Sequence, residues 1–75
     1  MTNYYDSQKL AYIELDNIIY SAIKNKTNIN ILLITLELTK KHPVSYKSIK
    51  NRINDIASIN HLKIVDNELK CEVKS

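Results

Sequence analysis

Apolar residues recur at spacings of three and four along the first third of the chain and predict a helix over 7–24, which Asp6 or Ser7 can cap. One broad side of this helix carries six apolar residues: Ala11, Leu15, Ile18, Ile19, Ala22 and Ile23. Leu10, Ile13 and Tyr20 fall on the other side. The helix is therefore apolar over more of its circumference than one core contact requires, which predicts that neighbouring elements or a partner cover it.

A second apolar run follows the polar segment KNKTN and predicts a helix over 28–41, with Thr27 or Asn28 as its cap. The helix is expected to stop at His42-Pro43, because a proline cannot continue the hydrogen-bond ladder. On a helical wheel its apolar residues occupy two opposite sides: Ile29, Leu32, Leu33 and Leu36 on one, and Ile31, Ile34 and Leu38 on the other. Such a helix is expected to be buried on both sides. Its β-branched residues leave a strand over 29–38 as the competing interpretation.

A third helix is predicted over 45–60, with Ser45 as its N-cap. Ile49, Ile53 and Ile56 recur at four and three and form a stripe that we expect to face the core. The opposite side is polar and carries Lys47, Asn51, Asn54 and Ser58, with Lys50 and His61 beside it and Asp55 at its margin.

The stretch LKIVDNELKCEV alternates apolar and polar residues on both sides of Asp66-Asn67 and predicts a β-hairpin over 62–74. A two-residue turn at Asp66-Asn67, where both residues tolerate positive φ, sets the register. The expected pairs are Val65 with Glu68, Ile64 with Leu69, Lys63 with Lys70, and Leu62 with Cys71. In this register the residues expected to point toward the helices are Leu62, Ile64, Leu69 and Cys71.

Three helices, a proline-marked turn before the third and a hairpin directly after it resemble the winged helix-turn-helix family of DNA-binding domains. The resemblance implies an α+β fold, mostly α with a C-terminal β-hairpin, formed by a single domain over 7–75 that follows a tail of residues 1–6. In this family the helix before the hairpin usually lies in the major groove, and the hairpin, called the wing, touches the neighbouring backbone. No short strand is evident between the first two helices, where many members have one.

We expect one core, made by Leu15, Ile18, Leu32, Leu36, Ile49, Ile53, Leu62, Ile64 and Leu69. Leu36→Ala or Ile53→Ala would then cost about 2–5 kcal/mol of unfolding free energy.

Composition excludes several classes of enzyme. The chain has no Gly, so a phosphate-cradling loop of the Walker or dinucleotide type cannot be built. Cys71, His42 and His61 stand at no recognised zinc spacing, and we interpret Cys71 as a small apolar group on the inner face of a strand. The eight acidic residues are scattered singly. We therefore expect a protein that is not an enzyme, without a metal, a cofactor or a small-molecule substrate.

The start of the chain, MTNYYDSQK, lacks the basic and apolar segments of a signal peptide. The longest apolar stretch, INILLITLEL, is about half of a bilayer span. We expect a protein without a membrane partner that stays in the cytoplasm, associated with the nucleoid if it binds DNA.

Charge is distributed unevenly along the chain. Residues 1–39 hold three Lys against four acidic residues, a balance of −1, whereas residues 40–75 hold seven Lys and Arg52 against four acidic residues, a balance of +4. A cationic surface attracts phosphates, and the basic half contains the third helix and the wing. The resemblance therefore implies double-stranded DNA as the partner of a small transcription regulator, with contacts from Lys47, Lys50, Asn51, Asn54, Ser58, Lys63 and Lys70.

Two other interpretations stay open. A lysine-rich helix face is often only a solvated surface. The surplus apolar surface of the first helix instead favours a homodimer or a larger protein partner, through Tyr5, Leu10, Ile13 and Tyr20. The chain would then be a non-catalytic accessory subunit or interaction module of a DNA replication or transcription complex.

Overall fold

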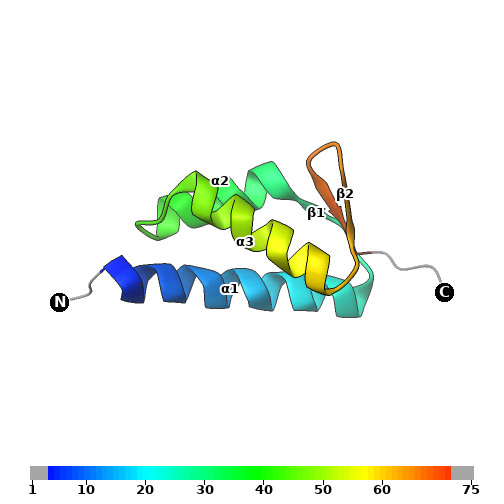
Figure 1. Ribbon diagram of the computed structural model, residues 1–75, viewed down its shortest axis with the longest axis horizontal. Coiled ribbons are helices and arrows are strands. Elements are labelled where there is room, and N and C mark those ends of the chain that lie inside the picture. The colour runs from blue at the N-terminus through cyan, green and yellow to red at the C-terminus, as the bar shows by residue number, and fades with distance from the viewer. Residues whose placement is uncertain (1–3, 72–75) are drawn as a thin grey trace.

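Three helices and a C-terminal hairpin form in the predicted order, but the first helix begins at Tyr4, so the predicted caps Asp6 and Ser7 lie inside it. The computed structural model describes the backbone of residues 4–71 and the side chains of residues 8–71. The elements are α1 (Tyr4–Asn25), β1 (Ile29–Asn30), α2 (Ile31–Lys41), α3 (Tyr46–Ile59), β2 (Lys63–Val65) and β3 (Glu68–Lys70). Figure 1 shows α2, α3 and the sheet on one side of α1, with α3 between α1 and α2. The predicted fold class, mostly α with a C-terminal hairpin in a winged-helix-like layout, is confirmed.

Side chains cap the starts of α2 and α3. The Oγ of Ser45 accepts the N–H of Ser48 at 3.1 Å, as expected for the cap of α3. The Oδ1 of Asn30 accepts the N–H of Leu33 at 3.1 Å and caps α2. The prediction that Thr27 or Asn28 caps this helix was wrong, because residues 29 and 30 are extended and pair in the sheet before the helix begins.

α3 ends in a Schellman motif built without glycine. His61 adopts φ 57°, the left-handed conformation that this motif requires. The N–H of Leu62 donates to the carbonyl of Ala57 at 2.8 Å, and the N–H of His61 donates to Ser58 at 3.3 Å. α1 closes with the same two bonds around Lys26, from Thr27 to Ala22 and from Lys26 to Ile23. Two ordinary side chains therefore occupy positions that most helices give to Gly, at a cost of about 1 kcal/mol each.

The hairpin has the predicted turn and register. Asp66 and Asn67 have φ values of 51° and 61°, which are typical of a type I′ turn. β2 pairs with β3 in three of the four predicted positions: Lys63 with Lys70, Ile64 with Leu69, and Val65 with Glu68. The fourth predicted pair, Leu62 with Cys71, lies beyond the ends of both strands.

A short strand between the first two helices went unrecognised in the sequence. β1 pairs with β3 through Ile29 opposite Leu69 and Asn30 opposite Glu68, so the sheet order is β1-β3-β2. The N–H of Ile31 also donates to the carbonyl of Asn67 at 2.8 Å. Two residues are too few to produce a visible alternation, and the competing strand over 29–38 is limited to these two.

Three residues of the predicted core lie outside it, and the core also holds residues that were not in the predicted set, such as Ile19, Ile34 and Leu38. Leu15, Ile49, Ile53 and Leu69 are buried as predicted, and Ile18 and Leu62 are half-buried against them. Leu32, Leu36 and Ile64 are exposed, so their assignment to the core was wrong. α2 is buried on one side only, through Ile31, Ile34, Thr35 and Leu38. Ile64 lies on β2, an edge strand of this sheet, which leaves part of its side chain uncovered.

The two alanine substitutions expected to be equivalent should now differ. Ile53 is 1% exposed, and Ile53→Ala is expected to remove about 2–5 kcal/mol of unfolding free energy, a large share of the total for so short a chain. Leu36 is 49% exposed, and Leu36→Ala is expected to cost under about 1 kcal/mol. Urea titration followed by circular dichroism measures both. Equal losses would contradict this assignment of the core.

Candidate nucleic-acid interface

The polar side of α3 is exposed as the sequence predicts. The isoleucine stripe of this helix is buried, so the opposite side faces solvent. That side carries Lys47, Asn51, Asn54 and Ser58, all exposed, at spacings of four, three and four. Asp55 is exposed at its margin. We call these four aligned residues the α3 face. They form a row about three turns long with donors and acceptors pointing outward.

Lys50 lies at the edge of the α3 face and is half-buried. Its Nζ lies 5.6 Å from the centroid of the Tyr46 ring, one turn earlier in the same helix. This arrangement is a cation–π contact, which restrains the lysine without neutralising it. Lys50 therefore keeps its charge for a phosphate, but it is held toward the start of α3.

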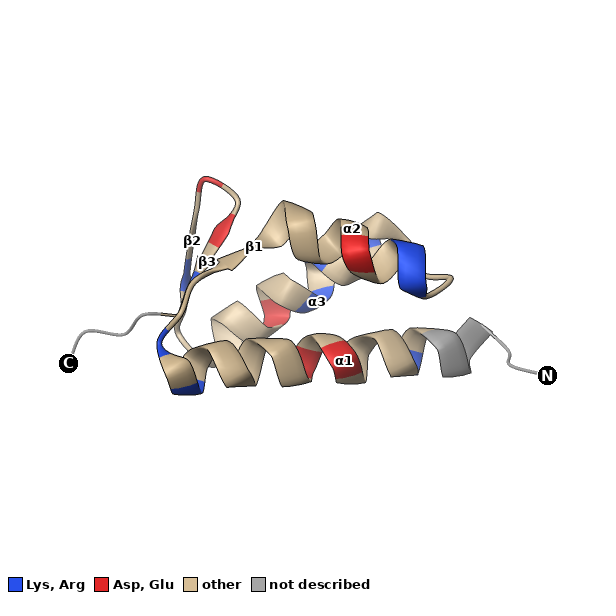
Figure 2. Ribbon diagram, turned by 180° about the vertical axis from the view of Figure 1, so that it is seen from behind, with Lys and Arg blue, Asp and Glu red and all other residues tan. Residues whose placement is uncertain are grey.

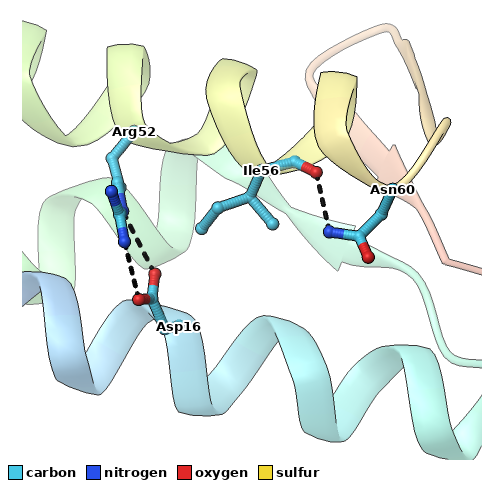
Figure 3. A network of polar contacts seen from close by, with 4 residues as sticks. All are labelled: Asp16, Arg52, Ile56 and Asn60. Atoms are coloured by element: carbon cyan, nitrogen blue, oxygen red, sulfur yellow. Dashed lines mark hydrogen bonds and ion pairs between the residues drawn. The ribbon is translucent and has the colours of Figure 1, made fainter.

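Arg52 belongs to a tether between helices, which the sequence did not reveal. Its Nη2 and Nε donate to the two carboxylate oxygens of Asp16 on α1 at 2.8 and 3.2 Å, as Figure 3 shows. The guanidinium also lies 5.3 Å from the centroid of the Tyr12 ring. The bond to Asp16 raises the pKa of Arg52 above its already high ordinary value. Because 36 residues separate Arg52 from Asp16, no pattern of neighbouring residues predicts this ion pair.

Among its described residues, the wing has one lysine that is not paired with a carboxylate. Lys63 is exposed and has no ion pair among the described side chains. Lys70 donates to Glu68 at 2.6 Å, and both side chains are 41% exposed. Its charge is therefore largely compensated within the wing. Figure 2 shows acidic residues at the tip of the hairpin and a basic one at the base of β2. The base of the wing, rather than its tip, is the part suited to a phosphate.

A second tether joins α1 to the end of α2. The Nζ of Lys41 donates to Oε1 of Glu14 at 2.9 Å, and Nε2 of His42 lies 3.7 Å from the same oxygen. The hydrogen bond from Lys41 lowers the pKa of the Glu14 carboxyl below its ordinary value. Glu14 and Asp16, the two described acidic residues of α1, are thus both engaged with neighbouring helices.

The predicted partner surface on α1 is exposed. Leu10, Ile13 and Tyr20 are 53%, 47% and 50% exposed and lie on the side opposite the buried residues of the helix. Tyr5 belongs to α1, but its side chain lies outside the described residues. The first helix therefore has apolar residues on two sides, of which the other helices cover one.

α2 presents an apolar surface that was expected to be buried. Leu32, Leu33 and Leu36 are all exposed, Leu33 by 65% of its side chain. The wheel pattern did show this second apolar side, but it could not show that no other described element covers it. Large exposed apolar patches typically mark interaction sites.

The described residues bring no metal-binding group together. Among them, no cluster of three or more His, Cys, Asp or Glu side chains could hold a metal ion. Cys71 is buried, as interpreted from the sequence, and burial raises the pKa of its thiol, which keeps it in the unreactive protonated form. None of the described helices is both long and apolar enough to cross a membrane.

Comparison with known proteins finds no family model, curated protein or solved structure that matches the chain. The geometry alone therefore describes the chain: three helices and a small antiparallel sheet in a winged-helix-like layout, with the polar side of the third helix exposed.

The Glu14 tether should make stability depend on pH. A lowered carboxyl pKa contributes stability that is fully present above the ordinary pKa of a glutamate, and this stability is lost as pH falls below that ordinary value and through the lowered one. Glu14→Gln is therefore expected to be less stable than the wild type at neutral pH, by about 0.2–1 kcal/mol for so exposed a pair. The difference should shrink by about pH 3. Urea titrations at the two pH values measure it, and a difference that grows on acidification would contradict the tether.

Proposed function

We propose that this protein is a small, non-enzymatic DNA-binding protein that docks the α3 face on duplex DNA and acts as a transcription regulator. The observation that carries the proposal is the α3 face itself, a row of exposed lysine, asparagine and serine side chains on a helix whose other side is fixed in the core. The backbone of a helix held in this way is already ordered, so only its side chains lose conformational entropy when it enters the major groove.

The chemistry of the α3 face suits both parts of DNA recognition. Lys47 carries a free positive charge in the first turn, where it would meet a phosphate. Asn51 and Asn54 lie in the middle of the helix, and an asparagine amide can form two hydrogen bonds with adenine. Ser58 would add a further donor near the end of the row. Lysine would therefore supply affinity, and asparagine would supply selectivity.

Lys63 at the base of the wing would add a second phosphate contact next to the helix. Lys50 would add a third contact near the helix start. Lys70 would contribute less, because Glu68 compensates its charge. Two or three phosphate contacts per copy imply modest affinity and a shallow salt dependence, with a log–log slope of about −2 to −3.

A second function has its own support. The exposed leucines of α2 favour an interaction module, in which the domain is a non-catalytic accessory subunit of a DNA replication or transcription complex. Binding of duplex DNA by the isolated protein separates the two, since only the first proposal requires it.

The lysines of the interface should act as independent phosphate contacts. Lys47→Ala and Lys63→Ala are each expected to weaken binding to every duplex alike and to flatten the salt dependence by roughly one unit. Lys70→Ala should have a smaller effect. Fluorescence anisotropy with a mixed-sequence duplex at several salt concentrations measures the slopes.

Lys40→Ala is the matched control. It removes the same charge from an exposed residue of α2, on the side of that helix opposite its buried residues. Asp55→Asn removes an acid beside the α3 face and should strengthen binding. If the Lys47/Lys63 double variant, still folded by circular dichroism, binds as tightly as Lys40→Ala, the α3 face is a solvated surface and the proposal is wrong.

The asparagines should act on selectivity. Once a preferred site has been selected from random duplexes, Asn51→Ala or Asn54→Ala is expected to cost about 1–3 kcal/mol on that site and much less on an unrelated duplex. Competition binding with the two duplexes gives the ratio. An equal loss on both would assign these residues to the backbone and not to the bases.

A further inference from the structure

The exposed side of α1 has a regular spacing that its apolar residues alone do not reveal. Leu10, Ile13, Asn17 and Tyr20 follow one another at intervals of three, four and three, and all four are exposed. We call this row the outer seam. It has the a, d, a, d spacing of a coiled coil over two heptads, with Asn17 at a central a position.

The surroundings of the outer seam leave room for another helix. Figures 1 and 2 view the molecule from opposite sides, and in both of them α2, α3 and the sheet lie on the same side of α1. The buried residues of α1, such as Ala11, Leu15 and Ile19, lie on the side of α1 that these elements cover. A helix laid along the outer seam would therefore meet α1 before any other described element.

We propose that the outer seam pairs with the outer seam of a second copy of this chain, with the two α1 helices parallel. In this arrangement each residue of the row meets its own counterpart, so apolar residues pack on apolar residues. The two Asn17 amides then face each other and can hydrogen-bond, which sets the register of such a pair. An antiparallel pair would instead place Asn17 against Ile13 and leave an amide unsatisfied at the contact.

The charges beside the outer seam favour the same orientation. Lys9 and Glu14 flank the row at the positions that meet across a parallel pair, so each Lys9 would face the Glu14 of the other copy. Glu14 already accepts from Lys41, but a carboxylate has room for a further donor. An antiparallel pair would bring Glu14 toward Glu14 and would move Lys9 away from it. Like charges opposed in this way disfavour that orientation.

The size of the contact sets the expected strength. Two heptads of helix surface bury on the order of 1,000 Å² in total, which is near the lower limit for specific association. The helices are already formed by the fold, so pairing does not have to order them. We therefore expect a reversible dimer with a dissociation constant of about 10 µM.

Sedimentation equilibrium without nucleic acid tests the dimer, and its outcome is independent of whether α3 binds DNA. Over about 1 µM to about 1 mM, the mass should rise from that of one chain, 8.7 kDa, toward twice that value. Ile13→Lys should stay monomeric throughout and keep its helical circular dichroism, since Ile13 is outside the core. Leu33→Lys is the matched control on α2 and should still dimerise. A monomeric wild type, or loss of the dimer in Leu33→Lys alone, would overturn the proposal.

Cross-linking tests the orientation. In a parallel pair, Leu10→Cys should form a disulfide with its own copy, and so should Tyr20→Cys, each as a single variant under mild oxidation. In an antiparallel pair the two positions meet each other, so only a mixture of the two variants would cross-link efficiently. The wild type is the control, because its single Cys71 is buried and should stay reduced. Cross-linking in the mixture only would overturn the parallel arrangement.

Discussion

Burial of one side of α3 is the constraint on which the rest of the structure depends. Ile49, Ile53 and Ile56 are almost entirely removed from water, in contact with the other helices. Because the apolar side of α3 is fixed in the core, the opposite, polar side is held facing the solvent. The Schellman motif at the end of α3 then turns the chain straight into β2, and Leu69 of the central strand is fully buried in the same core. The helix and the wing are thereby positioned together.

Ion pairs explain why the charge count overstates the basic surface. Arg52 and Lys41 are bound to carboxylates of α1, and Lys70 is bound to Glu68 on its own hairpin. These contacts are partly exposed, so each contributes little free energy, but each lowers the positive potential that a phosphate would meet. One copy of the domain would therefore bind DNA weakly. A dimer through α1 would join two α3 faces in one particle, and avidity could then make up for the small number of contacts in each copy.

Two of the three helices, α1 and α2, carry apolar residues on two sides, and in both helices the second apolar side is exposed. On α1 the outer seam is exposed. On α2 the exposed surface is formed by Leu32, Leu33 and Leu36, which we call the leucine surface. The two surfaces differ in what accompanies them. The outer seam has heptad spacing, a central asparagine and complementary charges, and these features support the proposed pairing with a second copy of the chain. The leucine surface of α2 has none of these accompanying features and therefore indicates no particular partner.

The sequence by itself determined the three helices and the hairpin of this protein. The Ser45 cap, the proline stop, the isoleucine stripe of α3 and the Asp66-Asn67 turn are local signals, because each depends on a few neighbouring residues and on their backbone preferences. The polar α3 face was predictable for the same reason, since a helix that buries Ile49 and Ile53 must expose Asn51 and Asn54.

Only the tertiary structure decided which of two apolar sides was covered and which basic residues were free. The wheel showed both sides of α2, but burial depends on whether another element reaches a side, and so Leu36 was placed in the core wrongly. Arg52 was counted as basic surface because its partner Asp16 stands 36 residues away. β1 was missed because a strand of two residues exists only through its partner Leu69 on the hairpin. In each case the deciding interaction joins residues far apart in the chain, and no local pattern records it.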